Sequence, residues 1–395
     1  MKALLLFVFF IQSSGYALVN GKIGNIDLSS SLTATYDSNL FGLQENEFIN
    51  NQKTNQNLKS SDDLILKLSP ILHYSKEVSL ITMSGSAGVE IANFMFNDSR
   101  SYIIPVTTFN LDFDESIKKR ISTNSKIRFS LDFDLGQSVG TDLTEGDLVS
   151  YTFFNTNLST RYNHSPKFGL GSGINYEIRE YQTGVVRNDY QDLSALPISS
   201  DLFYIYSPKL DFFLNHIYSI TKTSGDSSGM GNTISNSYSF GANGVLSPKL
   251  SGNVSLGYSR LSFKNANFSS RDSAVSNTSL RFKHNQKTSS QISIQRNFSP
   301  TATSSSQIST SMRYNLNHSF NSVMNGNVGI SQMFSEVFIN NLDSFEMKQF
   351  GFDISLSRIL SKYFTTMFSY NYNLISRKNT IFNRHLISAS ITGRF

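Results

Sequence analysis

The stretch from Ile387 to the end of the chain alternates between apolar and polar side chains. Ile387, Ala389, Ile391, Gly393 and Phe395 form one set, and serine, threonine and arginine residues occupy the positions between them. A period of two places these sets on opposite faces of a β-strand, so one face meets an apolar medium and the other meets water. The chain therefore has to build a sheet that separates two environments.

This segment resembles the C-terminal strand of bacterial outer-membrane β-barrels, which ends on an aromatic residue, usually phenylalanine. The resemblance implies that the five apolar residues form an assembly signal read by the barrel-assembly machinery. It also implies that the strand closes the barrel against the first one. A soluble β-sandwich could contain the same alternation, so the rest of the chain has to decide between the two.

The composition favours a sheet between lipid and water. Of the 395 residues, 39% are hydrophobic and only 16% are charged. This balance suits strands in which half of the residues face lipid and half face water. The chain has no cysteine, which excludes disulfides and thiolate metal sites. A formal net charge of +5 without a long basic cluster gives no indication of a nucleic-acid partner.

Residues 1–17 have the pattern of a secretory signal peptide. Lys2 supplies the positive start, residues 3–11 the apolar segment, and Gly15-Tyr16-Ala17 a small-x-small cleavage site. We therefore expect residues 18–395 to form a single outer-membrane barrel domain. Beyond the signal, no window approaches the ~18 apolar residues of a membrane helix. A membrane-spanning form would have to be a closed barrel, in which every backbone group is paired.

Turn signals divide the chain into regular strands. Eight short turns are expected near residues 75–78, 115–120, 163–167, 207–211, 247–250, 285–289, 318–322 and 360–363. Nine longer polar segments alternate with them, near 38–61, 96–102, 136–147, 182–196, 224–235, 264–273, 298–305, 335–346 and 375–382. Joined in this order they define eighteen strands, within a range of sixteen to eighteen. The sequence predicts an all-β, up-and-down antiparallel transmembrane barrel with short periplasmic turns and longer outer loops.

Three of the short turns are nearly identical: Ser165-Pro166-Lys167, Ser207-Pro208-Lys209 and Ser247-Pro248-Lys249. Proline presets φ for a tight turn, and serine bonds the local backbone. A soluble propeller or solenoid would also repeat at such a spacing. Each unit of a propeller or solenoid would also repeat characteristic side chains, whereas in this sequence only the turns recur.

Charged residues fall on one face of the predicted strands. Phe109, Leu111 and Phe113, for example, alternate with Asn110 and acidic residues. A Lys or Arg on the lipid face at the bilayer midplane costs ~2–4 kcal/mol, so the charged face has to point inward. The predicted pore-lining residues are Lys126, Arg128, Asp132, Asp134, Glu177, Arg179, Arg281, Lys283, Arg313 and Asp353.

Aromatic residues cluster beside the predicted periplasmic turns, as the interfacial girdle of a barrel requires. They are Tyr74, Tyr162, Phe168, Tyr206, Phe212, Tyr363 and Phe364. Four of the six histidines, His73, His164, His284 and His318, occur at the same level. We interpret them as part of this interfacial layer and not as metal ligands.

The stretch from Ser31 to Phe41, which contains Tyr36-Asp37-Ser38-Asn39-Leu40-Phe41, resembles the opening of the "beta-barrel porin 2" family. Members of that family begin with a strand that runs into a Tyr-Asp-x-Asn-aliphatic-Phe motif, and they use Ser-Pro-Lys/Arg turns between later strands. The resemblance implies an outer-membrane channel, in some members associated with surface-polysaccharide production. It implies no catalytic residues.

The sequence gives little support for catalysis. Only His216 and His385 lie away from the turn end, and no Gly-x-Ser-x-Gly motif accompanies them. The pairs Asp112/Asp114 and Asp132/Asp134 could bind Ca²⁺ through oxygen ligands. The neighbouring basic residues favour internal charge balance instead. We expect no enzyme activity, no cofactor and no metal.

The predicted function is passive diffusion of small hydrophilic solutes across the outer membrane of a Gram-negative bacterium. An eighteen-stranded barrel is wide enough for an aqueous channel unless loops fill it. Expected partners are outer-membrane lipids and lipopolysaccharide, the assembly machinery and the solutes. One alternative is a component of surface-polysaccharide export, with export proteins as partners. Others are a structural or adhesive barrel plugged by residues 38–61, and a soluble secreted β-protein.

Overall fold

The computed structural model describes residues 19–54, 58–114, 126–182, 184, 186, 189–224, 231–265, 267–303, 306–338, 343–378 and 380–395. The signal peptide predicted at residues 1–17 lies outside the described residues.

The chain forms one nineteen-stranded sheet, which consists of a three-residue strand β1 and the longer strands β2 to β19. The strands are β1 Val19–Gly21, β2 Gly24–Asp37, β3 Asp63–Val78, β4 Ile81–Phe94, β5 Tyr102–Asp114, β6 Lys126–Asp142, β7 Asp147–Asn163, β8 Phe168–Tyr181, β9 Leu193–Ser207, β10 Leu210–Thr223, β11 Thr233–Ser247, β12 Leu250–Phe263, β13 Arg271–Lys283, β14 Thr288–Pro300, β15 Ser306–Asn321, β16 Met324–Phe338, β17 Ser344–Ile359, β18 Phe364–Arg377 and β19 Thr380–Arg394. A helix α2, Glu45–Thr54, and a short 3₁₀ helix, Asp98–Arg100, lie in outer connections.

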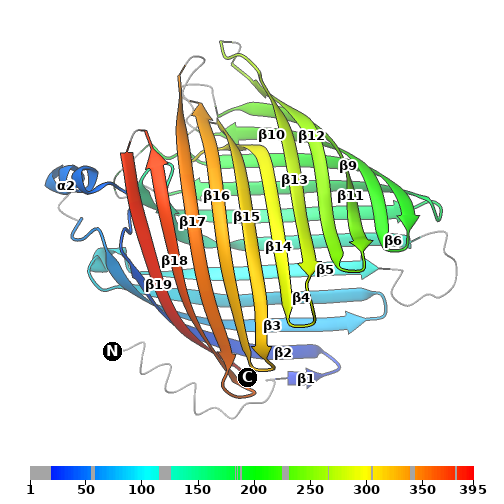
Figure 1. Ribbon diagram of the computed structural model, residues 1–395, viewed down its shortest axis with the longest axis horizontal. Coiled ribbons are helices and arrows are strands. Elements are labelled where there is room, and N and C mark those ends of the chain that lie inside the picture. Colours follow the sequence, from blue (N-terminus) through cyan, green and yellow to red (C-terminus); the bar gives the residue numbers. More distant parts are fainter. Residues whose placement is uncertain are drawn as a thin grey trace.

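The sheet closes on itself, as Figure 1 shows. Strands β2 to β19 pair antiparallel in chain order, and β19 then pairs with β2, from Leu386↔Asp37 to Arg394↔Ser29. The backbone N–H of Phe395 donates to the Leu28 carbonyl at 2.7 Å, and the Leu28 N–H donates to the Phe395 carbonyl at 2.9 Å. The predicted all-β antiparallel barrel of eighteen strands is therefore confirmed.

Two of the three Ser-Pro-Lys turns have the local bonds that their residues predict. The Ser165 hydroxyl accepts the backbone N–H groups of Lys167 and Phe168 at 3.2 and 3.0 Å. Ser207 accepts the N–H of Lys209 in the same way, at 3.3 Å. These bonds fix the turn, so the two flanking strands pair in a defined register.

Two predicted outer loops are much shorter in the structure. β6 continues to Asp142 and β7 starts at Asp147, so only residues 143–146 remain of the loop predicted at 136–147. The last outer connection, predicted at 375–382, is reduced to residues 378–379. The tip of the β6–β7 hairpin lies in the mouth of the barrel, where neither face meets lipid. The hydrophobic alternation that marks a strand is therefore missing there.

The outward face carries the apolar side chains. Leu214, Phe240 and Leu256 are neighbours across β10, β11 and β12, and they are 58%, 62% and 54% exposed. An exposed apolar band of this kind needs lipid around it. Tyr162, Phe168, Tyr206 and Phe212 are also exposed, near the short-turn end. The fold is therefore that of a transmembrane barrel.

No helix among the described residues has the length and apolar character needed to cross a bilayer.

One of the histidines assigned to the interfacial layer faces the other way. His73 lies on the inward face of β3, and its Nε2 is 2.7 Å from the Ser29 hydroxyl. Its neighbour Tyr74 is on the outward face and donates to the Ile23 carbonyl at 3.0 Å. Proximity to a turn placed both residues at the right level, but the alternation of side chains assigns them to opposite faces.

Candidate functional site

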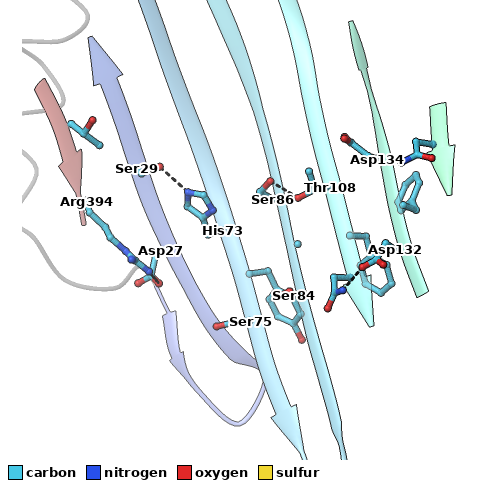
Figure 2. A pocket seen from close by; sticks show the side chains of 17 residues that line it. Asp27, Ser29, His73, Ser75, Ser84, Ser86, Thr108, Asp132, Asp134 and Arg394 are labelled. Carbon is cyan, nitrogen blue, oxygen red and sulfur yellow. Dashed lines mark hydrogen bonds and ion pairs between the residues drawn. The ribbon is translucent and has the colours of Figure 1, made fainter. Parts of the chain in front are cut away.

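The inward face of the barrel is polar and hollow. One hollow of about 760 Å³ lies along β2 to β7, and polar side chains from Asp27 to Asp134 surround it. Figure 2 shows Ser29 bonded to His73 and Ser86 bonded to Thr108 on this wall. Ser, Thr, Asn and Asp side chains keep such a surface wet, so the interior of the barrel is suited to water and polar solutes.

The register places nine of the ten predicted pore-lining residues on this inward face. Asp132 accepts hydrogen bonds from Asn110 and from Asn157, and Asp134 lines the same hollow. Arg281 and Lys283 line a second, more basic hollow of about 540 Å³ near the turn end of β13. For Lys126 the structure describes only the backbone, which begins β6 opposite Asn163.

Five of the ten predicted pore-lining residues form ion pairs. Arg313 Nη2 lies 2.5 Å from Asp353 Oδ1, and Arg179 Nη2 lies 2.5 Å from Glu177 Oε1. Arg128 Nε is 3.4 Å from Asp114 Oδ2. Among the described residues, no three His, Asp or Glu side chains come together in a way that could hold a metal ion. Asp114, Glu177 and Asp353 therefore balance the charge of arginines within the wall.

The Arg313–Asp353 pair spans an intervening strand because of a glycine. β16 lies between β15 and β17, and Gly329 is the residue opposite Asp353. A Cβ at Gly329 would lie 2.4 Å from Asp353 Oδ1. The absence of a side chain therefore lets Asp353 lean across β16 towards Arg313.

The sequence interpretation missed a second long-range pair. Arg161 Nη1 on β7 is 2.7 Å from Asp211 Oδ2 on β10, and its guanidinium lies 4.1 Å from the centre of the Phe203 ring on β9. Gly171 on β8 leaves the space through which Arg161 reaches, since a Cβ there would be 2.9 Å from the Phe203 ring. The sequence shows that Arg161 and Asp211 are charged. It does not show that they pair, because their pairing depends on how β7, β8, β9 and β10 align with one another.

The outer mouth is narrowed by residues that fold over it. We call residues 38–54, 58–61, 143–146 and 301–303 the mouth cap. Its core contains Leu40, Phe41 and Leu58, which are 2%, 0% and 1% exposed. They pack with Ile65, Phe94 and Leu148 of the wall, and the Phe41 and Phe48 rings stack 5.9 Å apart. Residues 38–54 and 58–61 thus contribute a packed element to the mouth.

Hydrogen bonds hold the mouth cap from several sides of the barrel. Arg384 on β19 donates to Asp37 and, at 2.8 Å, to Thr141 on β6; Thr141 in turn donates to the Leu40 carbonyl at 2.7 Å. Four strands separate β19 from β6 in the wall, so these bonds cross the mouth.

The opposite side of the barrel joins the same network. The Thr303 hydroxyl, between β14 and β15, donates to Glu145 Oε1 at 2.8 Å. The Gln191 N–H, between β8 and β9, donates to the Ala302 carbonyl at 3.0 Å. Connections from widely separated strands therefore meet above the lumen.

Asp147 anchors one of these connections. Its carboxylate is 0% exposed and accepts the Val186 N–H at 3.0 Å and the Tyr190 hydroxyl at 3.3 Å. Burial and the nearby Asp147 carboxylate raise the pKa of Tyr190 above its usual range, so the phenol remains a donor.

Asp63 fixes the outer end of β3 to the next connection. It is 0% exposed and accepts the backbone N–H groups of Met95, Phe96 and Asn97 at 2.8, 3.0 and 2.8 Å.

We expect Asp63→Ala to lower the temperature at which the barrel loses its folded gel mobility. Each orphaned buried donor costs about 1–3 kcal/mol. The control is Asp98→Ala, which removes an exposed ion pair with Lys59 and should have little effect. Equal shifts in both variants would contradict this assignment.

No protein-family model matches the chain, and no curated protein matches its sequence. Comparison with solved structures finds outer-membrane proteins among the similar chains. The outer membrane protein OpdK from Pseudomonas aeruginosa is 10% identical, with 94% of this chain and 99% of that chain covered and a TM-score of 0.47. OpdO from the same organism is 10% identical, with 94% and 97% covered and a TM-score of 0.48. OccAB4 from Acinetobacter baumannii is 10% identical, with 94% and 98% covered and a TM-score of 0.40. Similarity at this level assigns neither a family nor a solute.

Proposed function

We propose that this protein is an outer-membrane channel for the passive diffusion of small hydrophilic solutes. The observation that carries the proposal is the polar, hollow interior of a closed barrel whose exterior is apolar. Two hollows, of about 760 and 700 Å³, follow its inner wall. Such a barrel stabilises a water-filled path through hydrocarbon and leaves the mouth cap to set its width.

The pairing of the lumen charges supports weak charge selectivity. Arg161–Asp211, Arg313–Asp353 and Lys67–Glu90 each place one positive and one negative group within 3.0 Å. A solute ion passing such a pair experiences a dipole and not a net charge. We therefore expect selectivity by size and hydrogen bonding more than by sign.

Conductance of the refolded protein tests the channel. Single molecules in a planar bilayer under a KCl gradient should show stepwise conductance, with a reversal potential near zero. Folded barrels that show no conductance would defeat the proposal.

The Arg313–Asp353 pair gives a sharper prediction. We expect Arg313→Gln to shift the reversal potential towards cation selectivity, because Asp353 then carries an uncompensated charge. Asp353→Asn should shift it the other way, and the double variant should return close to the unmodified protein. Arg260→Gln is the matched control, since Arg260 lies on the outward face, 3.9 Å from Asp272. A shift of the same size in the control would show that the lumen pair does not set selectivity.

The route to the membrane rests on the predicted signal peptide and on the strand that ends at Phe395. We propose that residues 1–17 are removed on export and that the barrel-assembly machinery recognises β19. Mass spectrometry of the protein from the membrane fraction measures the first point directly, with cleavage after Ala17 as the expected result.

A plugged structural barrel is the second candidate. The burial of Leu40, Phe41 and Leu58 favours it, since a packed core in the mouth can also close it. The two candidates differ in the conductance of the unmodified protein, which a plugged barrel would lack.

A further inference from the structure

The wall is interrupted between β13 and β14. Their ladder runs only from Ser276↔Arg296 to Lys283↔Ser289. Above it, β13 stays paired with β12 as far as Arg271, and β14 stays paired with β15 as far as Pro300. The facing edges, residues 271–275 and 297–300, are therefore not paired with each other.

The interruption follows from the way the hairpins bend at the mouth. The connection after β14 turns inward to the mouth cap, where Thr303 and Ala302 make their bonds. The β12–β13 end remains outside, and its Phe263 and Phe268 pack against Phe298, Ile308 and Phe338. This aromatic cluster closes the top of the interval, and the ladder closes the bottom.

A comparable interruption between β5 and β6 is filled. That ladder ends at Val106↔Gly136, although β5 begins at Tyr102 and β6 continues to Asp142. Tyr102 and Val139 there pack against the core of the mouth cap. The corresponding packing at the interval between β13 and β14 is the aromatic cluster at its top, and the Arg296 side chain spans the two edges next to it.

The lumen reaches both edges of this interval. A hollow of about 700 Å³ is lined on β10, β11 and β12 by alternate, inward residues such as Ser237 and Ser255. On β13 and β14 it is lined by consecutive residues, Val275 to Asn277 and Gln295 to Phe298. Val275, Asn297 and Phe298 in this lining belong to the unpaired edges, so the hollow extends to both edges of the interval.

Arg296 bridges the interval. Its Nε donates to the Ala274 carbonyl at 3.2 Å and to the Ser273 hydroxyl at 3.3 Å, and its Nη1 donates to the Thr310 hydroxyl at 2.6 Å. An open strand edge in hydrocarbon costs several kcal/mol per unsatisfied group. A continuous ladder would satisfy these groups without an arginine. The side chain instead connects two edges that no ladder joins.

We propose that the interval between β13 and β14 is a lateral port, latched by Arg296, that admits the hydrocarbon chain of an outer-leaflet amphiphile into the lumen. The chain would pass Phe298 and Val275. The head group would be neutral and rich in hydroxyls. The charged residues of this hollow, Glu177, Asp201 and Arg296, already have partners in Arg179, Asn215 and the Ala274 carbonyl. The other polar side chains of its lining are neutral, among them Ser237, Ser239, Asn243, Ser255, Ser259 and Asn277. This path leads through the wall and is separate from diffusion along the barrel axis.

The chain contains no tryptophan, so single-tryptophan variants report cleanly on contact with lipid. The test reconstitutes Val275→Trp, Ser237→Trp and Leu256→Trp in phosphatidylcholine vesicles brominated on the acyl chains. Leu256 is 54% exposed on the lipid face, and Ser237 lies in a fully paired part of the lumen wall. We expect strong quenching for Leu256→Trp and little for Ser237→Trp. Val275→Trp should be quenched several-fold more than Ser237→Trp, and Arg296→Ala should increase this further.

Quenching of Val275→Trp no greater than that of Ser237→Trp, with and without Arg296, would overturn the port. A nitroxide attached to Asn297→Cys measures the surroundings of the opposite edge, on β14. This measurement does not depend on the Val275 variant. The relaxation of the nitroxide should respond to oxygen dissolved in lipid, and a response only to a water-soluble nickel complex would contradict the port. Dodecyl maltoside brominated on its chain should quench Val275→Trp more than brominated dodecanoate does; equal quenching would overturn the head-group assignment. Conductance is measured separately, so loss of the port leaves the channel proposal standing.

Discussion

Replacement of residues 40–59 by a short Gly-Ser linker is expected to raise the single-channel conductance several-fold. The segment supplies Leu40, Phe41 and Leu58, the most deeply buried part of the mouth cap. It also supplies the Leu40 carbonyl that accepts the Thr141 hydroxyl. Without these contacts the cap loses its core, and the opening should widen towards the diameter of the barrel. Conductance scales with the narrowest cross-section, so the change should be visible in single steps.

Phe41→Ala is the milder version of the same experiment. Truncation of a fully buried phenylalanine costs about 3–5 kcal/mol of packing. We expect more frequent transitions between conductance levels, with a smaller rise in the mean. The control is Phe240→Ala on the outward face, where the side chain is 62% exposed, and it should leave conductance unchanged. Unchanged conductance in the 40–59 replacement would show that the cap is not the constriction. A silent unmodified protein that conducts after replacement would favour the plugged barrel.

The fold was predictable because a barrel wall imposes a simple rule on every strand. Each residue faces lipid or water, so alternation marks the strands, and polar turns mark their ends. The predicted positions of Phe109, Leu111 and Phe113 on one face and Asn110 on the other agree with the register. The prediction failed where that rule does not apply, at residues 136–147, because the hairpin tip there lies out of the lipid.

The site was predictable only as a set of inward charges. Which charges pair depends on strand register and on glycines that leave room, as Gly329 does for Asp353. Local sequence contains neither piece of information. The mouth cap was foreseen as a possibility for residues 38–61, but its anchors are distant in sequence: Thr141, Arg377 and Arg384. The interval between β13 and β14 could not be foreseen, because the residues on its two edges continue regular strands.

Deletion of residues 387–395 is expected to abolish the folded, heat-modifiable form altogether. β19 is the strand that closes the barrel, and this stretch supplies most of its pairs with β2, from Ile387↔Tyr36 to Arg394↔Ser29. Its removal leaves edges of β2 and β18 in hydrocarbon, where each unsatisfied backbone group costs several kcal/mol. Tyr363 and Phe364 would also lose the Phe395 ring, whose centre lies 6.2 and 5.9 Å from theirs. Gel mobility of heated and unheated membrane samples measures the result.

Phe395→Ala separates recognition of the strand from its packing. If the assembly machinery reads this side chain, the variant should reach the membrane poorly in cells and still refold in detergent almost as well as the unmodified protein. Phe168→Ala is the matched control, because Phe168 is 51% exposed at the same end of the barrel and packs on Tyr204 at 5.6 Å. It should affect neither measurement strongly. Equal losses in cells and in detergent for Phe395→Ala would assign the residue to packing alone, since a recognition signal has no role in refolding without the machinery.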